Sequence, residues 1–223
     1  MYEYATGLIR VLDKKILDQT DFDRMLGAKN AEQAFKVLND TDYGDNLLNL
    51  KPEDFEKALE RDNKDLRKLF GKIIESKLLL KFLFLKNDFL ELKYYLKIKF
   101  GKIDTNKKSK VKKSLAEPVL LKLEKLNKIT PRKIDEICDS ELYKARQGLA
   151  RKMRDKFLQE ICKKDLDLNF DLEQIKLQAR NYAYGSPIIL EYFFKKVDAG
   201  RKIRIIMNAK LNNIAQEDLE KHL

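Results

Sequence analysis

Few residues of this chain are of the types that carry out catalysis. His222 is the only histidine, and Cys138 and Cys162 are the only cysteines. Because this lone histidine lies at the penultimate position, we expect neither His-based acid/base catalysis nor a His-rich metal site, and two cysteines outside a CxxC spacing are expected to be reduced thiols. Neither GxxxxGK[ST] nor GxGxxG is present, which excludes a P-loop site and a dinucleotide-binding turn. We therefore predict no catalytic residues, no cofactor and no small-molecule substrate.

Two acidic runs have oxygen-bearing residues at spacings that would suit a calcium loop. The run at 40–45 flanks Gly44, but no glutamate follows at the required distance, so a turn explains it better. In the alternating run at 165–171, Phe170 occupies the position where a calcium loop requires glycine. We therefore expect no metal site at either run.

The charge balance indicates an acidic partner. The net charge is +11 and the isoelectric point is near 9.4. Nucleic acid, anionic lipid or an acidic protein surface would each fit this charge, and a general lysine-rich composition is an equally good explanation. Tyr94 and Tyr95 lie among lysines, as in some nucleic-acid surfaces, although widening the buried stripe of a helix explains them better.

The elements that position these residues are expected to be helices, because Lys, Leu and Glu are abundant while Gly and Pro are scarce. The chain is organised around residues 78–103, where apolar residues recur at alternating steps of four and three. This spacing predicts one apolar face of a long helix, with Asn87-Asp88 as the point where it could be interrupted. The stripe consists of Leu78, Phe82, Leu85, Phe89, Leu92, Leu96 and Phe100.

A weaker copy of this helix lies near the C-terminus. Shifting the sequence by 111 residues places Leu92-Lys93 on Ile203-Arg204, and Lys99 on Lys210. An internal repeat predicts repeated helical modules. We expect an N-terminal module at 1–104, a basic linker at 105–114 and a C-terminal module at 115–223.

Capping residues indicate where the other helices begin. Thr20 is predicted to cap a helix at 21–26, and Asn30 with Gln33 resembles a capping box. Proline in a first helical turn is expected at Pro52, and Thr130-Pro131 and Ser186-Pro187 are expected to pair a cap with such a proline. Further segments are predicted as helices at 3–18, 140–163, 188–195, 198–211 and 215–222, and as a short strand or connector at 166–172.

No stretch is apolar enough to span a membrane. The most apolar run is interrupted by charged residues, whereas a bilayer needs about 20 consecutive apolar residues. The N-terminus lacks the continuous apolar region of a signal peptide, so we expect a cytoplasmic protein.

The opening segment MYEYATGLIRVLDKKILDQTDFDRMLGAKNAEQAFKVLNDTDYG resembles the start of the AC39 family, the C-type or d-type stalk component of the rotary V/A-type ATPases. The pattern Asp88-x-x-x-Leu92-Lys93 is similar to that family's Asp-x-x-Asn-Leu-Lys helix, with Glu91 where asparagine is usual. The segments GSPIILEYFFKK and KIRIIMNAKLNNIAQEDLEKHL resemble the family's ending, except that Ala199 replaces the usual acidic residue, with Asp198 beside it. The resemblance is strongest over 2–44, 86–100 and 184–219.

The resemblance implies an all-α fold and a mechanical role. Members of the family have three helical modules around a pseudo-threefold axis, and this shorter chain is expected to have about two. They are non-catalytic connectors that seat the central shaft, made of the D and F subunits, on the membrane proteolipid ring. The same role is therefore expected here, peripheral on the cytoplasmic face of the membrane, in ATP-coupled proton or sodium transport.

The predicted contact residues are cations that flank the repeated helices. Each of them could instead belong to a solvated face or to an ion pair within the chain. The alternative function is a basic helical module that binds nucleic acid or acts as a scaffold. The predicted contacts are Arg10, Lys93, Lys97, Arg201, Arg204 and Lys210.

Overall fold

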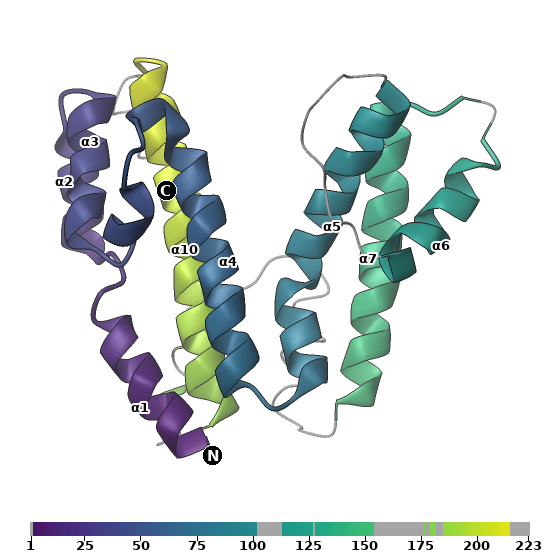
Figure 1. Ribbon diagram of the computed structural model, residues 1–223, viewed down its shortest axis with the longest axis horizontal. Coiled ribbons are helices and arrows are strands. Elements are labelled where there is room, and N and C mark those ends of the chain that lie inside the picture. The colour runs from purple at the N-terminus through teal and green to yellow at the C-terminus, as the bar shows by residue number, and fades with distance from the viewer. Residues whose placement is uncertain are drawn as a thin grey trace. The chain divides into compact units, whose positions relative to one another are not determined.

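The computed structural model describes residues 2–101, 113–126, 128–153, 176, 179–181 and 185–214. Every regular element in these ranges is a helix, which confirms the all-α prediction (Figure 1). The α-helices are α1 (Tyr2–Asp13), α2 (Gln19–Gly27), α3 (Ala31–Val37), α4 (Phe55–Ile73), α5 (Lys77–Gly101), α6 (Lys113–Leu123), α7 (Pro131–Lys152) and α10 (Ser186–Leu211). Three short 3-10 helices are η1 (Leu38–Asp40), η2 (Gly44–Leu47) and η3 (Pro52–Asp54).

The chain forms two compact units. Unit 1 combines Met1–Ile73 with Asp171–Leu223, and unit 2 is Ile74–Phe170. Unit 1 is therefore built from two stretches that are distant in the sequence, whereas unit 2 is continuous. This grouping by spatial contact differs from the modules at 1–104 and 115–223, which stay a prediction about the organisation of the sequence.

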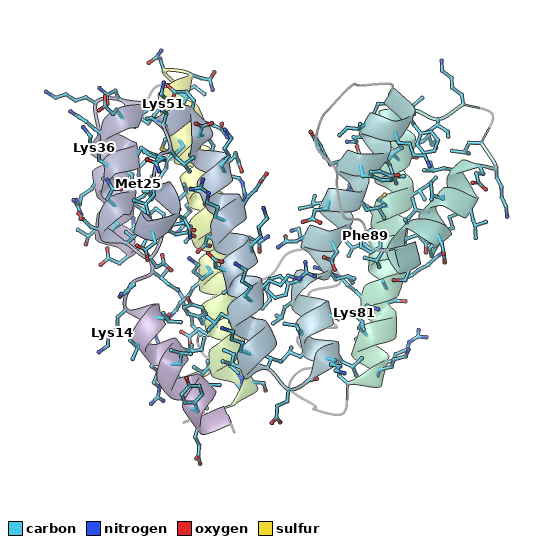
Figure 2. The ribbon with its side chains drawn as sticks, in the orientation of Figure 1. Lys14, Met25, Lys36, Lys51, Lys81 and Phe89 are labelled. Atoms are coloured by element: carbon cyan, nitrogen blue, oxygen red, sulfur yellow. The ribbon has the colours of Figure 1, made fainter. Side chains whose placement is uncertain are left out.

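Helix α10 is the central element of unit 1. It packs against α1, α2, α3 and α4, and Figure 1 shows it running beside α4. Its buried residues surround much of the helix, as expected for a helix enclosed by others. Met25 of α2 points into this core while Lys36 of α3 lies outside (Figure 2). The core of unit 1 includes Phe22, Met25, Phe35, Leu38, Phe55, Leu59, Ile203, Ile206 and Met207.

Unit 2 is built on the pairing of α5 with α7, with α6 packed on α7. The helices run antiparallel, because Lys93 bonds to Asp139 whereas the later residue Lys97 bonds to the earlier Asp135. The predicted apolar stripe is mostly correct. Its central members are buried and its end residues, Leu78 and Phe100, are partly exposed.

The two long helices have the same burial pattern in the register of the repeat. Leu92 and Ile203 are both fully buried, and so are Leu96 and Met207. The long helix α5 packs on α7, which begins at Pro131, and α10 packs on α4, which follows the 3-10 helix that begins at Pro52. In unit 2 the long helix comes first along the chain, whereas in unit 1 it comes last. The repeat is therefore visible in the packing as well as in the sequence.

Two predicted caps are wrong by one or two residues. Helix α2 is capped by Asp18 rather than Thr20: the Asp18 side chain accepts from the Asp21 N–H at 3.0 Å, and the Asp21 side chain accepts from the Asp18 N–H at 3.3 Å. This reciprocal pair satisfies two donors, which a cap at Thr20 would leave open. Ser186 is the buried first residue of α10, and the N-cap of this helix is Gly185, whose φ is 114°.

The caps at Asn30 and Thr130 are confirmed, and Pro52 lies in the first turn of η3. Several predicted helix bounds are wrong, however. Helix α5 has no break at Asn87-Asp88, α7 is one helix where a boundary near residue 140 was expected, and α10 is one helix where two were expected. Each continues because a neighbouring helix covers its apolar face, so local turn formers do not end it.

Helix α1 ends at Asp13 rather than at residue 18. The predictions for the strand at 166–172, the helix at 215–222, Cys162 and His222 lie outside the described residues. So does most of the linker at 105–114, whose last two residues belong to α6.

Candidate functional site

Two of the predicted contact residues form ion pairs inside unit 2. Lys93 Nζ lies 2.7 Å from Asp139 Oδ1, and Lys97 Nζ lies 2.8 Å from Asp135 Oδ2. The Lys93 side chain is only 17% exposed. Both lysines therefore hold α5 to α7.

Two further predicted contacts hold α10 within unit 1. The Arg204 Nε lies 3.0 and 3.1 Å from the two carboxylate oxygens of Glu56 on α4. The Lys210 ammonium donates to the carbonyl oxygens of Leu26 at 2.6 Å and Ala28 at 2.7 Å. These carbonyls lie at the C-terminal end of α2, where helical carbonyls lack intrahelical donors and a cation is favourable.

Arg201 and Arg10 remain on the surface. Arg201 is exposed on α10 and makes no ion pair within the part of the chain that the structure describes. Arg10 is exposed on α1 and lines a cavity of about 250 Å³ between α1 and α10. Lys93, Lys97, Arg204 and Lys210 thus bond within their own units, and Arg10 and Arg201 have exposed side chains.

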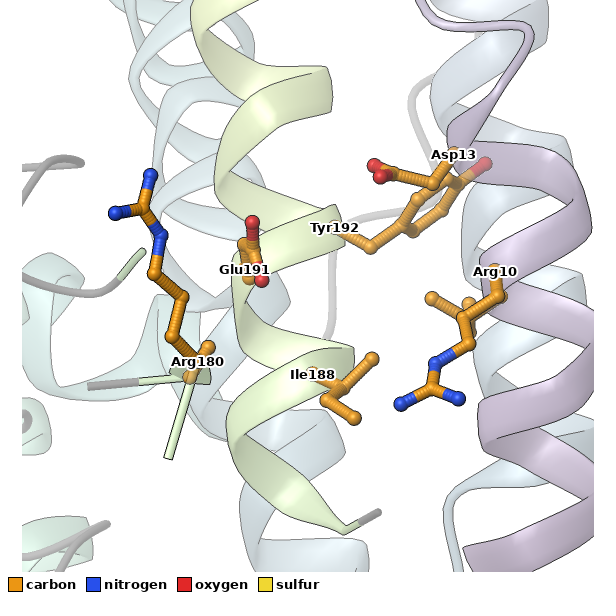
Figure 3. A pocket seen from close by; sticks show the side chains of 8 residues that line it. Arg10, Asp13, Arg180, Ile188, Glu191 and Tyr192 are labelled. Carbon is orange, nitrogen blue, oxygen red and sulfur yellow. The ribbon is translucent and has the colours of Figure 1, made fainter. Parts of the chain in front are cut away.

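The cavity beside Arg10 has mixed charge. Lys195 binds both of its carboxylates, Asp13 at 2.9 Å and Glu191 at 2.9 Å. Figure 3 shows the guanidinium groups of Arg10 and Arg180 far apart, on different sides of the α10 backbone, so they do not converge on one point. Burial, together with nearby aspartates, raises the pKa of Tyr192, so its phenol stays protonated at neutral pH. The arrangement suits a surface contact better than the binding of a small anion.

A second cavity of about 340 Å³ lies between the start of α2 and the middle of α10. Lys202 lines it, with its ammonium 3.3 Å from Asp198 and 5.1 Å from the centre of the Phe22 ring. Ala199, where the resemblance leads one to expect an acidic residue, is almost fully buried here. An acidic side chain at 199 would face the core, and the neighbouring acidic residue, Asp198, is half-buried and paired with Lys202.

The structure also contains a buried charge cluster that was not predicted from the sequence. Lys196 of α10 is 4% exposed, and its ammonium donates to Asp42 Oδ2 and Asp62 Oδ1, each at 2.7 Å. The same ammonium lies 3.9 Å from the centre of the Tyr43 ring, a cation–π distance. We call Lys196, Asp42, Asp62 and Tyr43 the Lys196 cluster. It joins α10 to α4 and to the turn before η2.

One signal in the sequence could have revealed this cluster. The shift of 111 residues places Lys196 on Leu85, a member of the apolar stripe, and Leu85 is fully buried. A lysine at a position that the repeat marks as buried requires carboxylate partners.

Burial dominates the electrostatics of the Lys196 cluster. It raises the pKa of Asp42 and of Asp62 above the usual aspartate value, and the opposing charge of Lys196 offsets this only in part. Burial also raises the pKa of Tyr43 well above that of a free phenol, and the two carboxylates add to the shift.

The acidic run at 40–45 is used for structure. Asp42 binds Lys196, and Asp40 lies 3.6 Å from Arg24. Within the described ranges, no group of three or more His, Cys, Asp or Glu side chains could hold a metal ion. No helix in those ranges is both long enough and apolar enough to cross a bilayer.

Comparison with known families gives one result. The family model described as ATP synthase (C/AC39) subunit matches residues 5–167, which is most of the chain. The matched range begins within α1, includes α2 to α7 and ends before α10, so the resemblance noted at 184–219 stays a prediction. Among curated proteins, no match is found.

Proposed function

Because the chain belongs to the ATP synthase (C/AC39) subunit family, and is thus a component of a V/A-type ATPase, we propose that it is the central-stalk connector of that complex. In this role it seats the shaft made of the D and F subunits on the membrane proteolipid ring, on the cytoplasmic face. It carries torque between them for ATP-coupled ion transport. The family consists of non-catalytic subunits, and no catalytic step is assigned to this chain.

The observation that best supports this proposal is the way α10 is fastened inside unit 1. Its cations bond to side chains of α1 and α4, to the turn before η2 and to backbone carbonyls at the end of α2. A part that transmits torque must resist shear between its helices. Bonds from one helix to four neighbours, together with a close-packed core, provide such resistance.

We propose Arg201 and Arg10 as the residues of the predicted set that contact other subunits directly. Both are exposed, and a cation on the rim of an interface chiefly sets the rate and the specificity of association. Lys93, Lys97, Arg204 and Lys210 would contribute by holding the helices that present the interface.

The test is reconstitution of the ATPase with charge-reversed variants. Arg201→Glu and Arg10→Glu are expected to reduce retention of the D and F subunits, or of the proteolipid ring, and to reduce ATP-driven ion uptake into vesicles. Lys36→Glu is the control, since Lys36 lies on the exposed surface of α3 with only a surface ion pair to Glu32. Failure of the unmodified chain to assemble with these subunits would contradict the proposal. So would binding to generic nucleic acid that falls steeply with salt, which the alternative function predicts.

A further inference from the structure

The Lys196 cluster has one cation for two carboxylates. Both carboxylates lie at 2.7 Å from the same ammonium, and their side chains are 12% and 16% exposed. With both aspartates ionised, the buried group has a net charge of −1. An uncompensated buried charge is unfavourable, and a carboxylate can remove it by taking up a proton.

Two oxygen atoms of the cluster lack hydrogen-bond partners. Asp42 Oδ1 and Tyr43 Oη are buried and unpaired within the described part of the chain. A carboxylate oxygen without a donor is costly to bury, whereas a protonated carboxyl group carries less charge on that atom. Asp42 Oδ1 is therefore a buried carboxylate oxygen whose negative charge no hydrogen bond offsets.

The neighbouring groups do not provide a second cation inside the cluster. The positive charges of Lys15 and Lys196 favour the ionised form of Asp42. The negative charges of Asp42 and Asp65 disfavour the ionised form of Asp62. The charge of Arg204 lowers the pKa of Tyr43. The charges of Asp42, Asp62 and Asp13 raise the pKa of Tyr192. Of these cations only Lys196 makes a direct bond to the two carboxylates.

Packing alone does not require this cluster. In the register of the repeat, Leu85 of α5 occupies the position of Lys196 and is fully buried. The same kind of long helix is thus packed in unit 2 with an apolar side chain at this place. Since buried ion pairs often stabilise no more than apolar residues of similar size, the charges of unit 1 call for another explanation.

We propose that Asp42 and Asp62 form a proton-binding site around Lys196, which takes up one proton in mild acid and so keeps α10 seated in unit 1. One proton brings the buried group to a net charge of zero, with Lys196 paired to the remaining carboxylate. The site does not depend on assembly with other subunits.

The direction of the effect on stability follows from linkage. An aspartate whose folded-state pKa is raised binds protons more tightly in the folded chain than in the unfolded chain. Between the unfolded value of 3.8 and the raised folded value, the contribution of this site to stability therefore falls as pH rises. Asp54 is the opposite case, because its bond to Lys57 lowers its pKa.

Carboxyl-resolved NMR titration of the full chain tests the site directly. We expect at least one of the Asp42 and Asp62 carboxyl resonances to titrate above the ordinary aspartate range, while Asp54 titrates below it in the same sample. Titration of both Asp42 and Asp62 at or below the ordinary value would overturn the proposal. This measurement needs no variant, so it does not depend on whether a substitution folds.

Unfolding by denaturant between pH 3.5 and 7 gives a second measurement. Asp42→Asn mimics the neutral side chain, so the wild type should lose stability relative to it as pH rises through the window. The ratio of their unfolding constants should change by up to about tenfold per pH unit. Asp54→Asn, the matched control, should show the opposite trend at lower pH. Parallel curves for the wild type and Asp42→Asn would contradict proton binding at this site.

Discussion

At the level of single residues, several cations of the long helices α5 and α10 bond within their own units. Lysines and arginines on a basic helix could be assigned from the sequence to a partner surface or to internal ion pairs with equal justification. The choice depends on which carboxylates and carbonyls come within reach, and this is decided by packing between distant segments. Lys210 shows the difficulty, because its acceptors are backbone oxygens at the C-terminal end of α2 and no acidic residue in the sequence points to them.

Lys210→Ala should destabilise unit 1. It removes two charge-assisted hydrogen bonds to carbonyls at the end of α2, for an expected loss of about 1.5–3 kcal/mol. Denaturant unfolding measures this change. Lys36→Ala is the control, where the lost ion pair with Glu32 is exposed and should cost less than about 0.5 kcal/mol. Equal losses of unfolding free energy for the two substitutions would show that the hydrogen bonds of Lys210 stabilise the chain no more than an exposed ion pair does.

Cys138 should be unreactive in the folded chain. It is fully buried, and burial raises the pKa of its thiol to about 11. At pH 8 about one thiol in a thousand would be ionised, and the thiolate is the reactive form. Alkylation followed by peptide-resolved mass spectrometry should therefore modify Cys138 only after denaturant is added. Rapid labelling in buffer would show that this part of α7 opens readily.

At the level of elements, capping residues and apolar spacing in the sequence predict that a helix exists more accurately than they predict where it begins and ends. Asn30 and Thr130 were found as caps because the bond from a cap side chain to the helix backbone is local. Asp18 was missed since Thr20 is an equally good local candidate, and the difference lies in the reciprocal bond from Asp21. The continuity of α5 and α10 depends on the helices that cover them, so turn-forming residues within the sequence were misleading. The Lys196 cluster was missed for the same reason, as its members come from three separate segments.

Gly185→Ala should weaken the start of α10. Gly185 has a φ of 114° and a ψ of −165°, a region that only glycine adopts without strain. The expected loss is about 1–3 kcal/mol in thermal or denaturant unfolding. Gly71→Ala is the matched control within α4, where an added Cβ meets nothing and should stabilise by about 0.5–1 kcal/mol. A neutral Gly185→Ala would show that this backbone conformation is not required.

At the level of the whole chain, each unit contains one long helix of the repeat, α5 in unit 2 and α10 in unit 1, but the two units are assembled from the sequence differently. The repeat of long helices could be read from the sequence because its apolar residues recur in register. The grouping of α10 with residues 1–73 could not, since a repeat shows which segments are alike and does not show which segments touch.

Matched core substitutions test this grouping. Ile203→Ala and Leu92→Ala remove fully buried side chains at equivalent positions and should each cost about 2–5 kcal/mol. Hydrogen exchange should rise in α1 to α4 and α10 for Ile203→Ala, and in α5 to α7 for Leu92→Ala. If Ile203→Ala left exchange in α2 and α3 unchanged, α10 would not be part of their core.

The placement of α10 also imposes an order on synthesis at the ribosome. Residues of α5 to α7 emerge as one continuous stretch and can pair as soon as they are made. Helices α1 to α4 leave the ribosome before them, yet α4 ends at Ile73 and the helix that completes their core begins at Ser186. At translation rates of about 5–20 residues per second, that wait lasts on the order of ten seconds. During this time, the apolar faces around Phe22 and Met25 are available to chaperones. Unit 1, whose first helices are synthesised first, is therefore the last to complete its core.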